Sequence, residues 1–305
     1  MMRKVIYSLI PVILFAAYSF GLRVFALLAV VLIFGIASEY VIMRGINKEK
    51  VKISEAVLVS CILYTLTLPP TVPFWIAAVG IIFGVIFGKG VFGGFGKNIF
   101  NPALVGRCFI YISFPSFMTL SWVNPFTSFP GGLIRFQGSV DALTNATPLI
   151  TLGKTGELTG YLALMLGRIS GSLGETSALL IAACGIYLIV TKTASWKVML
   201  STFLSFSLLN TVLYFTNVTQ ADPLFSLLAG GFMFGMVFMV TDPISAPKDD
   251  TSRIIYGILI GLVTAVIRIF GLFAEGMMFA ILIGNMFVPL IERNVKQAKS
   301  KKVTT

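Results

Sequence analysis

The sequence predicts an all-α membrane protein whose chain crosses the bilayer about ten times. First, its 305 residues are 57% hydrophobic and only 11% charged, whereas a soluble domain has roughly 25% charged residues. Second, apolar runs recur along the chain, most of them close to the length of about 20 residues that a helix needs to cross the hydrocarbon core. Third, most Lys and Arg residues lie in the short segments between these runs, which is how membrane proteins are oriented.

Ten apolar runs are the candidate spans. They cover residues 5–21, 24–43, 55–68, 72–88, 99–114, 175–191, 196–215, 223–240, 253–270 and 275–291. The third run is short and ends at Leu68-Pro69-Pro70, so it predicts a broken or re-entrant helix. The tract at 158–168 is too short to span, and it predicts a half-helix or an interfacial segment.

The basic residues predict the orientation. With the N-terminus inside, 17 of the 23 Lys and Arg residues fall on the inner face: Arg3, Lys4, Arg44, Lys48, Lys50, Lys52, Lys89, Lys97, Lys192, Lys197, Lys248, Arg253, Arg293, Lys296, Lys299, Lys301 and Lys302. Five fall outside, namely Arg23, Arg135, Lys154, Arg168 and Arg268, and Arg107 lies within a span. This bias predicts that both termini are cytoplasmic and that the polar loop 115–156 faces outward.

The runs divide into one membrane domain with four parts. The first part, residues 5–114, contains five spans. The outer loop covers 115–156, the second group of spans covers 157–291, and a basic cytoplasmic tail covers 292–305. The segments GIIFGVIFGKG from Gly80 and GFMFGMVFMVTDP from Gly231 are alike. Duplicated halves with interrupted helices are common in transporters, although chance similarity in a chain rich in Gly and Phe is an equal alternative.

Composition also excludes several functions. The chain has no His, its three Cys residues (Cys61, Cys108 and Cys184) are far apart, and no CxxC or strand-linked GxGxxG motif occurs. His-based catalysis, a four-cysteine iron–sulfur cluster and a nucleotide site within this chain are therefore not expected. We expect no catalytic residue and no metal site of its own. The net charge of +11 reflects the inner loops and does not indicate a nucleic-acid partner.

Ionisable residues within spans are costly, so they are candidate functional residues. The candidates for an ion path are Asp242, Asn101, Glu39, Glu292 and Arg107. Asp242 precedes Pro243 and Asn101 precedes Pro102, and freed carbonyls beside a carboxylate suit Na⁺ or a proton path. Alternatively, Asp242 caps the next segment, and Glu39 and Glu292 are ordinary interfacial charges.

The outer loop contains the polar stretch SVDALTNATPLITLGKTGE, residues 139–157. Asn145-Ala146-Thr147 fits the N-glycosylation pattern, which requires a secretory pathway. An ordinary polar connector is a second interpretation, and a cofactor-carrying loop is a third.

Five motifs occur in order: GGFGKNIFNPALVGR (93–107), NATPL (145–149), GSLGETS (171–177), MVTDPISAP (239–247) and EGMMFAILIGNMFVPLIE (275–292). On these motifs the chain resembles the family that contains RnfD, of the Rnf electron-transport complex, and NqrB, of the sodium-translocating NADH:quinone oxidoreductase. The 305 residues and the short segment before Val5 are closer to the RnfD branch. The resemblance implies a fold like the urea transporters, with two five-helix halves of inverted topology and interrupted helices.

The resemblance also implies that the outer loop carries FMN, esterified through its phosphate to a Thr by a flavin transferase. The family's carrier motif resembles Asp-Gly-x-Ser/Thr-x-Ala-Thr, and here it reads Asp141, Ala142, Leu143, Thr144, Asn145, Ala146, Thr147, followed by Pro148. Thr147 takes the carrier position, and Ala142 departs from the usual Gly. A second flavin such as riboflavin between the helices stays open. Arg107 either neutralises an acid or approaches the flavin phosphate.

The implied function is that of a membrane flavoprotein which relays electrons between ferredoxin and NAD⁺ within the Rnf complex and is coupled to Na⁺ or H⁺ translocation. It would not be catalytic alone. The implied partners are the membrane proteins RnfA and RnfE, the flavoprotein RnfG, the proteins RnfB and RnfC with iron–sulfur and nucleotide sites, and lipid of a bacterial or archaeal cell membrane. The alternative is a urea-transporter-like solute channel without a cofactor, which has no need of the 139–149 motif.

Overall fold

A computed structural model describes residues 1–46, 53–120, 122–127, 129–136, 146–175, 177–271 and 276–303. Within these ranges every regular element is a helix. The α-helices are α1 (Met2–Phe20), α2 (Arg23–Ile46), α3 (Glu55–Leu66), α4 (Phe74–Val85), α5 (Pro102–Ser113), α6 (Pro115–Thr119), α7 (Pro148–Thr155), α8 (Tyr161–Leu166), α9 (Ala178–Val190), α10 (Trp196–Phe215), α11 (Pro223–Leu228), α12 (Phe232–Phe234), α13 (Asp250–Phe270) and α14 (Gly276–Val303). Two π-helices, η1 (Ile86–Gly90) and η3 (Gly235–Met239), and one 3₁₀ helix, η2 (Gly131–Ile134), complete them.

The predicted class, an all-α protein with several membrane-spanning helices, is confirmed. Helices α1, α2, α10, α13 and α14 are long and apolar enough to cross a bilayer, and α3, α4 with η1, α5 and α9 are shorter apolar helices. Each of the ten predicted runs contains helix. At the C-terminal end the helix is longer than the predicted span, which ends at residue 291, because α14 continues through the basic tail to Val303.

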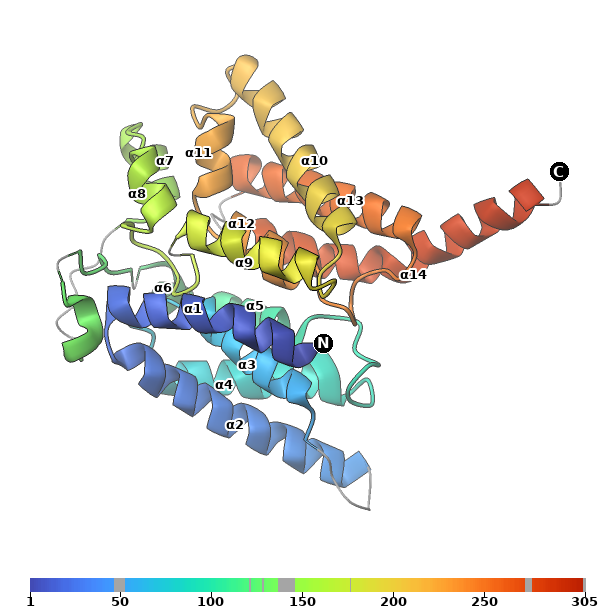
Figure 1. Ribbon diagram of the computed structural model, residues 1–305, viewed down its shortest axis with the longest axis horizontal. Coiled ribbons are helices and arrows are strands. Elements are labelled where there is room, and N and C mark those ends of the chain that lie inside the picture. Colours follow the sequence, from blue (N-terminus) through green and yellow to red (C-terminus); the bar gives the residue numbers. More distant parts are fainter. Residues whose placement is uncertain are drawn as a thin grey trace.

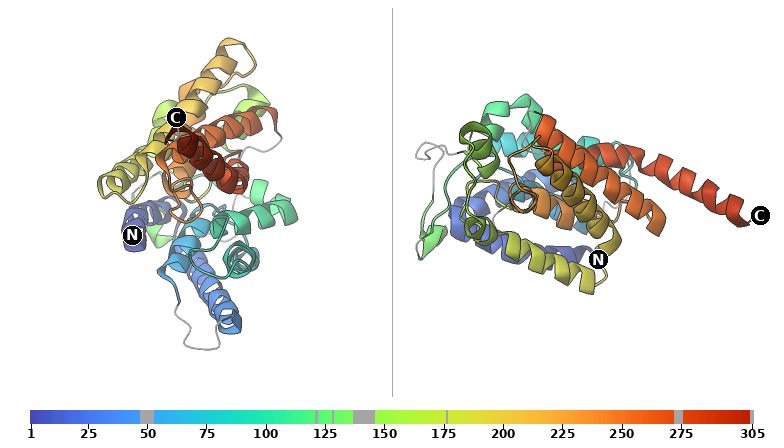
Figure 2. Two further views of the ribbon diagram at one scale, coloured as in Figure 1. Left: turned by 90° about the vertical axis from the view of Figure 1, so that its right-hand side faces the viewer. Right: turned by 90° about the horizontal axis from the view of Figure 1, so that it is seen from above.

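The helices gather in two groups. Helices α1–α5 lie together in the lower part of Figure 1, and α9–α14 lie together in the upper part. The groups meet where α1 packs against α9 and where α5 packs against α14. Both termini lie at one end of the molecule, while α6, η2, α7 and α8 lie at the opposite end, as the second view in Figure 2 also shows. We call these the terminal end and the loop end.

Small residues let helices approach closely within each group. A Cβ atom at Gly261 of α13 would lie 2.6 Å from the Thr202 carbonyl oxygen of α10, and one at Gly257 would lie 2.8 Å from that of Val198. In the first group, a Cβ atom at Gly84 of α4 would lie 2.4 Å from the Pro102 carbonyl oxygen. In lipid there is no hydrophobic driving force between helices, because the lipid tails are themselves apolar. Close packing at small residues is therefore a main source of helix association.

The third and fourth runs are separated by a break at Pro69 and Pro70, and the helix of the third run is short. Helix α3 ends at Leu66, and the chain resumes as helix at Phe74. The carbonyls exposed by the break find donors elsewhere, as a low-dielectric interior requires. Gly174 and Leu173 donate their N–H groups to Leu66 and Leu68 at 2.6 and 3.1 Å. Arg23 donates to the carbonyl oxygens of Pro70, Thr71 and Val72.

The eighth run is interrupted in a similar way. Helix α11 ends at Leu228, Gly230 has a φ of +67°, and α12 begins at Phe232. Here Arg268 of α13 supplies the donors, to the carbonyl oxygens of Ser226 and Ala229. In both interruptions, carbonyls are thus satisfied by an arginine from a neighbouring helix.

The two similar sequence segments share an uncommon conformation. The segment from Gly80 contains η1 and the segment from Gly231 contains η3, and both are π-helices. In each, two Phe rings one turn apart pack together, with centroids 4.5 Å apart for Phe83 and Phe87 and 5.1 Å apart for Phe234 and Phe238. The two segments therefore share a local conformation that is rare in proteins, and an internal repeat stays a prediction.

Candidate functional site

Thr147 stands at the start of α7, at the loop end of the molecule. Its backbone is extended (φ −70°, ψ 159°), and its Oγ accepts a hydrogen bond from the N–H of Ile150 at 3.5 Å. Pro148 occupies the first helical position, where its missing N–H has no cost, and Gly156 ends the helix with a φ of +74°. Local sequence therefore fixes Thr147 as an N-cap whose side chain lies among the free N–H groups of the helix.

Of the predicted carrier motif, the structure describes Ala146, which is exposed, Thr147, which is half-buried, and Pro148, which is buried. Asp141, Thr144 and Asn145 lie outside the described residues. Their place in a flavin-carrier motif stays a prediction.

Thr147 lines a cavity between the start of α7 and the two helix groups, which we call the loop-end cavity. Its lining includes Tyr111, Trp122, Ile169 and Glu175. Trp122 is 4% exposed, and its indole Nε1 has no hydrogen-bond partner in the described part of the chain. The wall thus combines apolar side chains with buried polar groups, among them the Trp122 indole N–H and the Ser170 hydroxyl, and with the carboxylate of Glu175.

A second cavity lies between α5, η3, α13 and α14, and we call it the central cavity. Arg107, Arg268 and Glu175 line it. Glu175 lines both the central and the loop-end cavities, so its side chain stands between them. Arg107, which the sequence predicts within a span, lies in α5 and is only 5% exposed. Glu175 was not among the predicted site residues, although the GSLGETS motif contains it.

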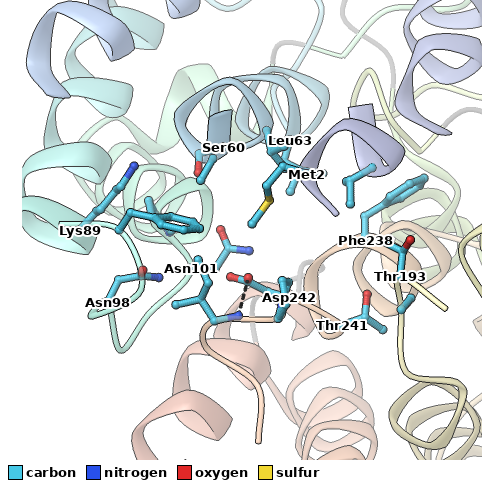
Figure 3. A pocket seen from close by; sticks show the side chains of 18 of the residues that line it. Met2, Ser60, Leu63, Lys89, Asn98, Asn101, Thr193, Phe238, Thr241 and Asp242 are labelled. Carbon is cyan, nitrogen blue, oxygen red and sulfur yellow. Dashed lines mark hydrogen bonds between the residues drawn. The ribbon is translucent and has the colours of Figure 1, made fainter. Parts of the chain in front are cut away.

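A third cavity opens at the terminal end, and we call it the terminal-end cavity. Asp242 and Asn101, two of the predicted ion-path residues, line it from different helix groups, together with Lys89, Asn98 and Thr241. Figure 3 shows the side chains of Asp242 and Asn101 near each other in the middle of this cavity.

Both residues are also caps. Asp242 accepts hydrogen bonds from the N–H of Ile244 at 3.1 Å and from the Ser245 hydroxyl at 3.0 Å. Asn101 accepts one from the N–H of Ala103 at 3.0 Å and so begins α5. Asp242 therefore caps the segment that follows it, and it also lines the terminal-end cavity.

Glu39 forms a buried ion pair with Lys89. Its side chain is 3% exposed, and Oε1 lies 2.8 Å from the Lys89 ammonium, which is itself 4% exposed. The Ser54 hydroxyl donates to the same Oε1 at 2.8 Å, while Oε2 is buried without a partner among the described residues. Because Lys89 lines the terminal-end cavity, Glu39 reaches that cavity only through its partner.

Glu292 lies apart from the three cavities. Its Oε1 accepts a hydrogen bond from the N–H of Lys248 at 2.8 Å, which ties α14 to the segment that follows Asp242. The predicted ion-path residues thus divide: Asp242 and Asn101 share one cavity, Arg107 lines another, and Glu39 and Glu292 hold neighbouring elements together.

These features define a polytopic membrane protein with interrupted helices and three polar-lined cavities between two helix groups. A family model described as the NQR2, RnfD, RnfE family matches residues 1–301. The chain belongs to this family.

Relatives of two kinds are similar to it. The D component of the Na⁺-translocating ferredoxin:NAD⁺ oxidoreductase complex of Acetobacterium woodii is 36% identical over 300 residues, which cover 97% of this chain and 88% of that protein. The B component of the Na⁺-translocating NADH-quinone reductase is 39% identical over 266 residues in Chromohalobacter salexigens and 41% over 268 residues in Ectopseudomonas mendocina. The matches cover 82% and 86% of this chain but only 61% and 64% of those longer proteins.

Proposed function

We propose that this chain is the flavin-carrying membrane component of an Rnf-type electron-transport complex, with FMN esterified to Thr147. The observation that supports this most directly is the place of Thr147, at the end of the carrier motif, at the start of α7 and on the rim of the loop-end cavity. Family membership supports the complex, since relatives in the family are components of Na⁺-translocating oxidoreductases.

The described residues fit an FMN phosphoester. A phosphoryl group on Thr147 Oγ would stand at the N-terminus of α7, where unpaired N–H groups and the helix dipole favour a negative charge. The apolar side chains of Trp122, Ile169 and Tyr111 lie beside it and suit an aromatic ring system. Bound there, FMN would supply the capacity to accept and release electrons. This chain's residues would hold the ring, exclude water and set its potential.

In this proposal the ten helical runs are ten spans, and the two groups are inverted five-helix halves like those of urea transporters. The support is that each group contains five runs, that both termini lie at one end (Figures 1 and 2), and that α1 meets α9 while α5 meets α14. The terminal end is then cytoplasmic, and the loop with Thr147 faces outward in a bacterial or archaeal cell membrane.

The proposed chemistry is relay of electrons between ferredoxin and NAD⁺, coupled to movement of Na⁺ or H⁺, together with the other Rnf proteins (RnfA, RnfB, RnfC, RnfE and RnfG). The terminal-end cavity is the proposed cytoplasmic part of the ion path. Asp242 offers a carboxylate there, and Asn101 and Thr241 offer neutral oxygens, which are the ligand types that hard cations prefer.

The experiment that tests the proposal is fluorescence of the denatured chain in a gel under ultraviolet light, after co-expression with a flavin transferase. The wild type should fluoresce, and Thr147→Val should not. Thr155→Val is the matched control, since Thr155 is exposed at the far end of the same helix, and it should fluoresce normally. Fluorescence lost with Thr144→Val and kept with Thr147→Val would show that the wrong threonine was assigned. A wild type that carries no flavin would favour the cofactor-free solute channel.

A further inference from the structure

Trp122 differs from the other two Trp residues of the chain. Trp75 and Trp196 are 54% and 53% exposed, whereas Trp122 is 4% exposed. The loop that holds Trp122 is fixed to the segment between α8 and α9, because the Ser170 hydroxyl donates to Asn124 Oδ1 at 2.7 Å. Ser170 lines the same loop-end cavity as Trp122. The indole is therefore held in place by its surroundings.

The indole Nε1 of Trp122 is buried and has no acceptor among the described residues. Buried donors in native proteins are nearly always paired, because an unpaired one loses its hydrogen bond to water and gains nothing. An indole N–H can only donate. Its partner is therefore not among the described residues, and a group bound in the loop-end cavity, which Trp122 lines, can supply the acceptor.

We propose that Trp122 Nε1 donates a hydrogen bond to an acceptor on the pyrimidine edge of the FMN ring system, and that this bond helps to set the flavin's reduction potential. The proposal rests on the attachment of FMN at Thr147. Trp122 and Thr147 line one cavity, and an isoalloxazine presents carbonyl oxygens and ring nitrogens as acceptors. Negative charge grows on that edge when the ring is reduced, so a donor there stabilises the reduced form and raises the potential.

The direct test is a vibrational measurement on a protein in which Trp122 is the only Trp, made by Trp75→Phe and Trp196→Phe. Ultraviolet resonance Raman spectroscopy contains an indole band that reports hydrogen bonding at Nε1. The band is compared between protein made with and without the flavin transferase. We expect it to shift toward stronger hydrogen bonding on flavin attachment. An unchanged band in protein that carries covalent flavin would overturn the assignment of Trp122 and leave the attachment at Thr147 intact.

The second test is the midpoint potential of the attached flavin. Trp122→Phe removes the donor and keeps an aromatic ring. It should keep covalent flavin in the gel and shift the potential to more negative values. Trp75→Phe is the control and should leave the potential unchanged. A Trp122→Phe potential equal to that of the wild type would refute the assignment. If this variant fails to fold, the Raman comparison decides. If wild-type protein carries no covalent flavin, both the attachment and the role of Trp122 are wrong.

Discussion

Arg268 donates from Nη1 to the carbonyl oxygen of Ala229 at 3.1 Å, and so closes the break in the eighth helical run with a side chain from α13. The same Nη1 donates to the Ser226 carbonyl at 2.8 Å, and the guanidinium lies over the ring of Phe206 at 5.4 Å. Arg23 does the equivalent at the break after α3, with its guanidinium 4.5 Å above the ring of Phe74. In both helix groups a cation stabilises an interrupted helical run.

Substituting Arg268 should therefore destabilise the fold. Arg268→Met keeps the long apolar stem and removes the donors to Ser226 and Ala229. An unsatisfied buried polar group costs about 1–3 kcal/mol, so we expect a lower temperature of unfolding in detergent. Arg293→Met is the control, since Arg293 is exposed on α14, and it should unfold like the wild type. An Arg268→Met protein as stable as the wild type would show that these carbonyls are satisfied in another way.

The contact between α10 and α13 should tolerate no added side chain at Gly261. A Cβ atom there meets the backbone oxygen of Thr202, which cannot move aside without shifting a helix. Gly261→Val should cost about 1–3 kcal/mol or more, the usual penalty for overpacking. Gly45→Val is the matched helical control, because a Cβ atom at Gly45 meets nothing within 4 Å. Thermal unfolding monitored by size-exclusion chromatography measures both. Equal destabilisation by the two variants would mean that loss of glycine alone, and not the contact, is responsible.

The pair formed by Glu39 and Lys89 should show strong coupling. Removing one member of a buried ion pair leaves an uncompensated charge and costs about 3–5 kcal/mol. Glu39→Gln and Lys89→Met should each destabilise the protein by this order. The double variant should be milder than the sum of the two, as a double-mutant cycle measures. Additive effects would indicate that the two charges do not depend on each other.

The orientation of the chain can be tested with single cysteines in a variant without the three native ones. Lys154→Cys lies on α7 at the loop end and Ser300→Cys lies on α14 at the terminal end, both at exposed positions. An impermeant thiol reagent applied to intact cells should label the first and not the second, and inverted vesicles should give the opposite result. The reverse pattern would place the flavin loop in the cytoplasm.

Asp242→Asn tests the ion path. Asn can still accept the hydrogen bond from the N–H of Ile244, so the turn and the covalent flavin should persist, while the charge that attracts a cation is lost. We expect ion uptake into vesicles and electron transfer from ferredoxin to NAD⁺ to fall at least ~10-fold, equivalent to about 1.4 kcal/mol. Asp249→Asn is the control. Asp249 caps α13 and pairs with Lys299, which holds the pKa of its carboxyl below the usual range, and it lines none of the three cavities. Normal transport and turnover in Asp242→Asn would remove Asp242 from the mechanism.

The sequence by itself determined the class, the helical runs and the interruption after α3. Apolar runs of membrane length predict helices, because backbone groups in lipid must pair within their own helix. Prolines predict where a helix ends, because they lack an N–H group. The resemblance to a known family, and not local rules, marked Thr147 as a candidate site, whereas the Pro residues after Asn101 and Asp242 can be read directly from the sequence. Family motifs supplied the chemistry expected of these positions.

Only the tertiary structure decided which residues meet. Asp242 and Asn101 are 141 positions apart and line one cavity, while Glu39 is buried in an ion pair with Lys89 of another helix. Glu175 and Trp122 gained their importance from the cavities they line, which no local pattern marks. The interruption of the eighth run depends on Arg268 from the next helix along the chain. Such contacts depend on how the helices pack against one another. Packing brings together helix faces that are distant in the chain, and the order of residues within a single helix does not determine it.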